Sequence, residues 1–326
     1  MQLLPERIRC RSIFQLSLPG SHDSGSYELD VCQDFSKDIK RQFRNWRRLL
    51  RLLSKRRVLC WARTQTISIG QQLQLGVRYF DFRVVSVQVD KVKKKTELEE
   101  GFRFCHALHG PSIFVLCDQI NTFLTDHTGE VVIIDFQHFY DFQLQDHRFL
   151  IQKCLQIFGQ KLCPRSFQTR LGEEMTLNLL HQQNIQIILV YREPVIFALL
   201  EVDFFWTEES ICNPFANTNS VKHLLDRLVV HLQQRDSLKF HVFQGVLTFG
   251  FKNCFSLLRG NLFDDLARHC NKSLLDWLRQ LNPPQPQPNI VMFDFVNSYE
   301  LELIKQVINL NYRFDDQNKS FQVNLI

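Results

Sequence analysis

The first residues that suggest chemistry are a histidine and an aspartate side by side near the N-terminus. The apolar run 13–18 gives way to a short polar turn that carries His22 and Asp23. An apolar strand that delivers titratable side chains at its C-terminal end is how a β/α barrel builds an active site. A triad of the consecutive residues Ser21, His22 and Asp23 is not expected, because neighbours on extended chain point to opposite sides. A solvated loop histidine is the alternative interpretation.

A second pair of charges lies within an apolar run. Asp81 and Arg83 are two residues apart in the run 76–84, so on a strand they project from the same face. Opposite charges on one face of a buried strand are costly unless they pair or face a polar cavity. This pair therefore indicates either a structural ion pair or part of a site.

Polar residues also stand at the ends of the other apolar runs. They are His106 and His109 in the run 102–111, Gln137 and His138 at the end of 131–138, Arg192 after 185–191, and Asp294 in 290–296. Two histidines on different strands suit phosphodiester cleavage, in which one removes a proton and the other delivers one. An arginine can offset the phosphoryl charge without a metal, and a carboxylate can hold the basic histidine in one tautomer. A metal site would need several converging carboxylates, and Arg83 beside Asp81 argues against it.

The pattern of elements predicts how these residues meet. Predicted strands alternate with predicted helices at 67–75, 113–126, 146–158, 221–233, 257–281 and 300–310. Seven or eight strand–helix units without a long linker predict one α/β domain over residues 1–326, a distorted (β/α)8 TIM-type barrel. In a barrel the C-terminal ends of the strands converge on one mouth, which would bring the polar residues together.

Composition limits the setting of the protein. Its 10 cysteines include no CxxC pair, which favours reduced thiols over a disulfide framework or a zinc site. The N-terminal residues lack a secretory apolar region, and no apolar run reaches the ~18 residues of a membrane-spanning helix. We therefore expect a cytoplasmic protein, peripheral to membranes if it associates with them.

The segment 37–57 differs from the rest of the chain. It holds ten basic residues and one acid, Asp38, so it carries +9, whereas the whole chain carries +5. Apolar residues recur there at steps of three or four, which predicts an amphipathic helix, an insertion suited to an anionic membrane surface. A helix that packs on the domain with a solvated basic face is the alternative. Binding to RNA or to a calmodulin-like partner also stays open from this segment alone.

Several motifs together resemble a known family. The stretches LPGSHDSGSY, GVRYFDFR, FCHALHG and EVVIIDFQHFYDF are similar to the X domain of phosphatidylinositol-specific phospholipase C. The likeness extends over about residues 13–314 and is strongest to the small animal PI-PLC X domain-containing proteins. It implies a phosphoinositide substrate, a phosphoric diester hydrolase and no nucleic-acid partner.

The resemblance also implies roles for individual residues. His22 would be the general base, Asp294 would orient it, and Arg83 would contact the phosphate. The other expected roles are Asp23 supporting Arg83 or the acid histidine, Asp81 as the acid of the family's DxR strand, and His106 as general acid with His109 as its rival. Asp23 and Arg83 match the calcium-independent bacterial type, which implies neither a metal nor a cofactor.

Some positions depart from the family pattern. A substrate-contacting lysine of the bacterial enzymes is replaced near Gln137 and His138, and Arg192 matches an inositol-phosphate contact only by its place at a strand end. The resemblance thus implies metal-independent cleavage of phosphatidylinositol to diacylglycerol and a cyclic inositol phosphate, with His109 a further candidate for substrate contact. The alternatives are a catalytically weak module that binds phosphoinositide or anionic membrane, and a glycerophosphodiester phosphodiesterase with an acidic metal cluster.

Overall fold

The computed structural model describes residues 1–36, 38, 54–87, 99–167, 175–194, 202–249, 258–283 and 285–313. Its strands are β1 Leu18–Ser21, β2 Asp30–Phe35, β3 Tyr79–Ser86, β4 Phe102–His106, β5 Leu108–Ser112, β6 Val132–Tyr140, β7 Ile187–Tyr191, β8 Ile211–Cys212, β9 Phe240–Gly245 and β10 Ile290–Phe293. Its α-helices are α1 Glu6–Arg9, α4 Lys55–Ala62, α5 Ile69–Gln74, α7 Ile113–Asp126, α8 Leu144–Phe158, α9 Leu177–Gln182, α10 Val221–Gln233, α11 Arg268–Gln280 and α12 Glu302–Arg313. The expected helices at 113–126 and 221–233 coincide with α7 and α10.

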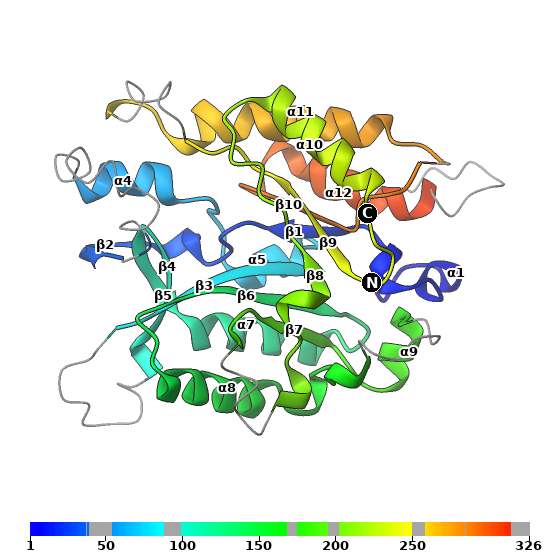
Figure 1. Cartoon of the computed structure of the whole chain (residues 1–326), viewed down its shortest axis with the longest axis horizontal. Coiled ribbons are helices and arrows are strands. Elements are labelled where there is room, and N and C mark those ends of the chain that lie inside the picture. The colour runs from blue at the N-terminus through cyan, green and yellow to red at the C-terminus, as the bar shows by residue number, and fades with distance from the viewer. Residues whose placement is uncertain are drawn as a thin grey trace.

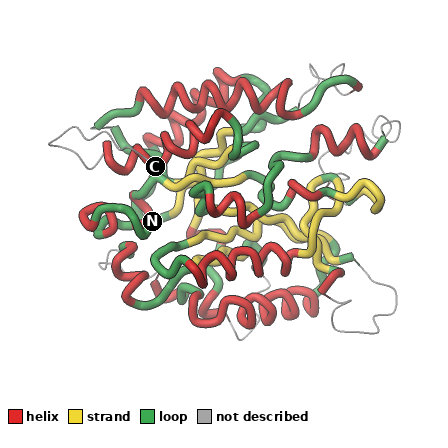
Figure 2. Tube along the Cα trace, turned by 180° about the vertical axis from the view of Figure 1, so that it is seen from behind, coloured by secondary structure: helices red, strands yellow, loops and turns green. Residues whose placement is uncertain are grey.

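Parallel strands form the centre of the fold. In the described residues they follow one another in the order β8, β9, β10, β1, β3, β6 and β7. Trp206, just before β8, forms a parallel bridge to Val190 of β7 and so links the two ends of this series. Helices α10, α11 and α12 lie on one side of the strands and α7 and α8 on the other (Figure 1), and the strands lie between these helices when seen from behind as well (Figure 2). The predicted barrel architecture is confirmed.

The prediction of a barrel strand over residues 102–111 is wrong. This stretch is a hairpin, in which β4 pairs antiparallel with β3, β5 with β4, and β2 with β5. The chain reverses at Ala107, which has a left-handed φ of 60°. Alternating apolar residues suit either strand direction, and alanine gives no turn signal, so the reversal was not visible in the sequence.

The first strand also begins later than expected. Residues Ile13–Gln15 form a 3-10 turn, and β1 runs through the Pro19-Gly20 pair that the sequence suggested as the start of a turn. Gly20 fits a close approach, because a Cβ there would lie 3.0 Å from the Tyr79 ring and 3.3 Å from Cα of Met292. The turn therefore starts at His22.

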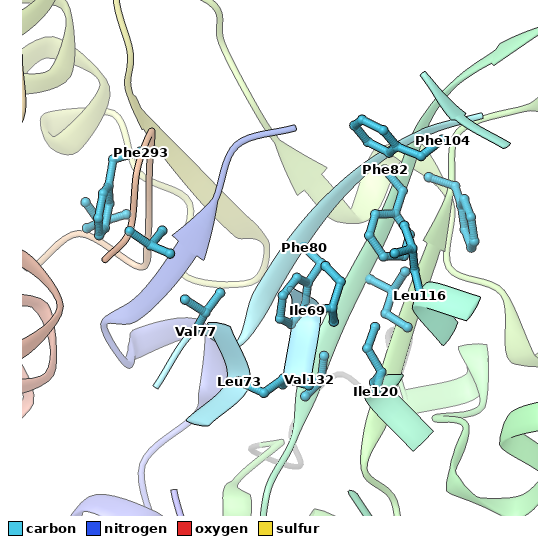
Figure 3. Packing of buried hydrophobic residues seen from close by; sticks show 14 of the residues in the cluster. Ile69, Leu73, Val77, Phe80, Phe82, Phe104, Leu116, Ile120, Val132 and Phe293 are labelled. Atoms are coloured by element: carbon cyan, nitrogen blue, oxygen red, sulfur yellow. The ribbon is translucent and has the colours of Figure 1, made fainter. Parts of the chain in front are cut away.

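Side chains on the barrel strands alternate between two cores. The outward-facing set includes Phe80 and Phe82 of β3, which pack against α5 and α7 beside Leu116 and Ile120 (Figure 3). The inward-facing set fills the lower barrel with Leu18, Tyr79, Ile133, Ile188, Val190, Val242, Ile290 and Met292. Since neighbours two apart share a face, the inward positions that follow these apolar residues hold the polar residues of the site.

The predicted basic helix over 37–57 falls mostly outside the described residues. Ser54 has extended backbone and caps α4, so the helix that contains Lys55 and Arg57 begins only after it. Both side chains donate hydrogen bonds to the domain, Lys55 to the Gln33 carbonyl and Arg57 to the Gly260 carbonyl. Among the described residues, no helix has the length and apolar character needed to cross a membrane.

Candidate active site

In several strands of the barrel, the inward-facing residues change from apolar to charged toward the C-terminal end of the strand. In β3, Tyr79 is followed by Asp81 and Arg83, and in β10, Met292 is followed by Asp294. The resulting cluster contains six of the predicted site residues: His22, Asp23, Asp81, Arg83, His106 and Asp294. The mouth of the barrel therefore holds the residues that the sequence placed at strand ends.

Hydrogen bonds hold both the ring and the backbone carbonyl of His22. Its Nδ1 lies 2.7 Å from Oδ1 of Asp294, which fixes the tautomer with the hydrogen on Nδ1 and leaves Nε2 toward the cluster. Its carbonyl oxygen accepts hydrogen bonds from the Thr64 hydroxyl at 2.9 Å and from Nε2 of Gln65 at 3.1 Å. The ring is therefore oriented by a carboxylate and its backbone by the loop after α4.

Asp23 lies at the centre of the charged groups. Its Oδ1 is 2.7 Å from Nε of Arg83, and its Oδ2 is 3.2 Å from Nε2 of His22 and 3.4 Å from Nε2 of His106. Adjacent His22 and Asp23 both face the cluster because the chain is not extended there, and Asp23 has a φ of 41°. Burial opposes the charge of this carboxylate, but the nearby cations lower the pKa of Asp23 to about 2.

Asp81 ties the histidine turn to β3. Its Oδ2 accepts from the Asp23 amide at 3.1 Å and lies 3.8 Å from Nη2 of Arg83. Burial and the Asp23 charge raise the pKa of Asp81 to about 6, although Arg83 opposes that rise. Within one site, therefore, Asp23 is held as a carboxylate and Asp81 is protonated more readily.

The structure separates the two candidate acid histidines. His106 ends β4 with Nδ1 donating to the Ala62 carbonyl at 2.7 Å, and its ring centroid is 6.4 Å from that of His22. His109 lies on β5 and its Nδ1 is 3.1 Å from Oε1 of Gln33 on β2. Of the two, it is His106 whose Nε2 lies near Asp23, so the geometry favours His106 over His109 for the acid role.

The surrounding carboxylates favour the protonated form of His22. Burial lowers the pKa of this imidazole, but Asp23, Asp294 and Asp81 outweigh it and raise the pKa to about 9. Arg83 acts in the other direction at short range, since its Nη2 lies 3.4 Å from Nε2 of His22 and can donate there only when His22 is neutral. The side chains of His22, His106 and Arg83 remain 11–15% exposed, so the cluster is reachable from solvent.

Arg192 and Gln137 belong to a neighbouring network. Arg192 donates to both carboxylate oxygens of Asp135, whose Oδ2 also accepts from the Tyr79 hydroxyl at 2.7 Å. Nε2 of Gln137 donates to the same hydroxyl at 3.1 Å. His138 pairs with Arg83 in the strand register, and its charge when protonated contributes to the low pKa of Asp23. Of the expected substrate contacts, Arg192 is thus paired with Asp135, and Gln137 is bonded to the Tyr79 hydroxyl.

Within the described part of the chain, two groups of side chains have the composition of metal ligands. His22, Asp23 and Asp81 offer ligand atoms within 4.8 Å of one another, but Arg83 already occupies Asp23. Cys212, His231 and His241 form the second group, between β8, β9 and α10. Nε2 of His241 accepts from the Asp236 amide at 2.9 Å, so the neutral ring carries its hydrogen on Nδ1. Neither ring nitrogen of His241 then has a free lone pair for a metal.

Some site residues had no signal in the sequence. Thr64 and Gln65, which hold the His22 carbonyl, lie in a loop without a recognisable motif. Asp38 was visible only as the one acid in a basic segment, yet its side chain is fully buried and accepts from the Ala107 amide beside His106. Ala62 contributes a backbone carbonyl, which no side-chain pattern reveals.

Comparison with known proteins identifies the family of this chain. The chain is 32% identical to mouse PI-PLC X domain-containing protein 3, over 97% of this chain and 94% of that protein. It is also 32% identical to mouse PI-PLC X domain-containing protein 2, over 97% and 88% of the two chains. The chain belongs to the PI-PLC X domain-containing proteins. No family model matches it.

Solved structures support the same fold for this PI-PLC X domain-containing chain. The phosphatidylinositol-specific phospholipase C of Listeria monocytogenes superposes with a TM-score of 0.63 at 19% identity, covering 95% of this chain and 96% of that one. A Staphylococcus aureus phosphatidylinositol-specific phospholipase C gives a TM-score of 0.61 at 13% identity, covering 92% and 94%. At these identities the likeness establishes the barrel fold, and the chemistry must be argued from the residues.

Proposed function

We propose that this chain is a phosphoinositide phosphodiesterase of the phospholipase C type, acting by histidine acid–base catalysis. The observation that carries the proposal is the arrangement of two histidines around one carboxylate. Nε2 of His22 and Nε2 of His106 lie 3.2 and 3.4 Å from Oδ2 of Asp23, with the Arg83 guanidinium on the other oxygen. A phosphodiester between the two rings would have a base on one side and an acid on the other.

The anchors of the two rings support different roles. His22 donates from Nδ1 to the Asp294 carboxylate, which stabilises the imidazolium that forms when Nε2 accepts a proton. His106 donates from Nδ1 to the carbonyl of Ala62. This neutral carbonyl does not stabilise a His106 imidazolium as a carboxylate would. His22 is therefore the proposed base and His106 the proposed acid.

The proposed reaction balances within the site. Nε2 of His22 removes the proton of the inositol hydroxyl next to the phosphodiester, and that oxygen attacks phosphorus. Arg83 stabilises the negative charge on the phosphoryl oxygens, and Nε2–H of His106 protonates the leaving oxygen of diacylglycerol. The products are diacylglycerol and a cyclic inositol phosphate, and His106 is left neutral while His22 holds the transferred proton.

The rim of the mouth suits a substrate that sits in a bilayer. Phe215, Leu258 and Tyr299 follow β8, β9 and β10 and are 53%, 67% and 36% exposed. They lie in connections at the same end of the barrel as His22, since all these strands are parallel to β1. Exposed apolar side chains at the same end of a barrel as a polar site favour contact with lipid. The basic segment 37–57 is the second proposed membrane contact.

Hydrolysis of phosphatidylinositol in mixed vesicles tests the proposal, with EDTA present and the His22→Ala protein in parallel. We expect diacylglycerol release by the wild type alone. Charge reversal at Arg44, Arg47 and Arg48 should weaken vesicle binding without changing turnover of a water-soluble substrate. Release by neither protein, with both folded, would favour the module that only binds phosphoinositide, and loss of wild-type activity with EDTA would favour metal-dependent chemistry.

A further inference from the structure

The turn that carries His106 is held by a short segment from elsewhere in the chain. His106 and Leu108 face each other across the hairpin, so Ala107 makes the reversal alone, with a φ of 60°. For a residue with a side chain, left-handed backbone of this kind is unfavourable. Partners outside the hairpin must therefore stabilise the turn if His106 is to keep its place.

Asp38 and Ser36 supply those partners. The Ala107 amide donates to Oδ2 of Asp38 at 2.6 Å, and the Ala107 carbonyl accepts from the Ser36 amide at 2.9 Å. Both polar groups of the turn residue are thus satisfied by residues 36 and 38. The bond to Asp38 is charge-assisted and fully buried, and bonds of this kind are stronger than neutral ones.

The place of His106 depends on this turn. Its ring has one hydrogen-bonded anchor, the Ala62 carbonyl, and its Nε2 lies 3.4 Å from Asp23. A displacement of the turn by about 1 Å would move Nε2 by a similar amount, and such misplacement can cost about 10²-fold in rate. The residue beside the proposed acid is therefore the natural place for a positioning device.

We propose that Asp38 is a positioning residue for His106, which it holds in place through the Ala107 turn. The inference rests on the proposed function, because it assigns His106 the delivery of a proton to the leaving oxygen. Asp38 touches no reacting atom in this account. It acts through the backbone of the residue next to the acid.

The test compares two substrates that differ in their need for an acid. Phosphatidylinositol has a poor alkoxide leaving group, whereas inositol 4-nitrophenyl phosphate releases a stable phenolate without protonation. With Asp38→Ala we expect kcat on phosphatidylinositol to fall about 10- to 100-fold at unchanged KM, within the range that acid catalysis supplies. On the nitrophenyl substrate the same protein should stay within about twofold of wild type.

Two further variants separate the possible causes. Asp38→Asn keeps an oxygen that can accept from the Ala107 amide, so it should lose less than Asp38→Ala. Asp34→Ala, the matched control, removes an exposed acid of β2 and should leave both rates unchanged. If Asp38→Ala does not fold, Asp38→Glu takes its place, because it keeps the charge and moves the acceptor.

An NMR measurement keeps this inference distinct from the proposed function. The His106 ring resonances, assigned by their loss in His106→Gln, should shift in Asp38→Ala and not in Asp34→Ala. If wild type turns over neither substrate, the proposed function fails and these resonances still decide whether Asp38 positions His106. Equal losses on both substrates, or unmoved His106 resonances, would overturn the inference.

Discussion

The sharpest consequence of the site concerns the protonation of His22. A base must be neutral to accept a proton, yet the surrounding carboxylates raise the pKa of His22 to about 9 despite its burial. A pH of 7 is about two units below this pKa, so only about 1% of the free protein carries the neutral ring. Forming that state costs about 3 kcal/mol, at 1.36 kcal/mol per pKa unit.

The substrate decides whether this cost is visible. With phosphatidylinositol the rate also needs a protonated His106, and the two requirements produce a profile in which neither limb belongs to one residue. With inositol 4-nitrophenyl phosphate no acid is required, so kcat/KM follows the base alone and reports the free protein. We expect kcat/KM to rise about tenfold per pH unit above pH 7 and to level off near pH 9, about 100-fold higher.

Asp23→Asn tests the cause of the shift. The Asp23 carboxylate lies 3.2 Å from Nε2 of His22 and is the first of the groups that raise its pKa. Unit charges about 4 Å apart interact by about 4 kcal/mol at an effective dielectric constant of 20, or about three pKa units. Removing this charge should therefore move the rising part of the kcat/KM profile by one pH unit or more to lower pH, even though the maximal rate falls.

The assay is release of nitrophenolate between pH 6 and 10, followed in a buffer series of constant ionic strength. Stopped time points with the phenolate measured at one high pH remove the effect of its own ionisation. A plateau that begins near pH 6.5, the ordinary value for histidine, would refute the argument that Asp23 and Asp294 hold His22 as imidazolium. An unchanged limb in Asp23→Asn would refute the assigned cause.

The other predictions concern stability. Arg83→Met should abolish turnover and lower the free energy of unfolding by about 3 kcal/mol in urea titrations, because it leaves the buried Asp23 carboxylate without its guanidinium; a change below 1 kcal/mol would contradict this. Gly25→Ala should cost about 1–3 kcal/mol, because its Cβ would lie 2.6 Å from the Phe104 ring. Gly70→Ala is the matched control in α5, where the nearest atom is 3.8 Å away, and it should stabilise by up to about 1 kcal/mol; equal effects of the two substitutions would reject the packing argument.

The sequence was most informative where the fold imposes a simple rule. Inward-facing positions two apart placed Asp81 and Arg83 on one face, and the barrel brought strand ends such as His22 and Asp294 together. These predictions needed only strand periodicity and the convergence of parallel strands. They did not need the exact ends of β1, which the sequence misplaced.

The remaining features depend on tertiary contacts that have no local signal. The reversal at Ala107 is stabilised by Asp38, and that bond joins residues 69 positions apart. Arg192 was expected to contact a phosphate, and in the structure its Nε and Nη2 donate to the two carboxylate oxygens of Asp135 on the neighbouring strand. The register between strands decides with which polar neighbour a side chain pairs. Residue spacing along the chain does not reveal that register.

The measurement that tests the account most directly is a 31P NMR time course of phosphatidylinositol cleavage by the wild-type protein with EDTA. Attack by the neighbouring inositol hydroxyl, deprotonated by His22, requires a cyclic inositol phosphate to accumulate first and any open inositol phosphate to follow it. We expect that order in wild type and no phosphorus product with His22→Ala. Direct appearance of the open inositol phosphate would show that water is the nucleophile and would contradict the proposed mechanism.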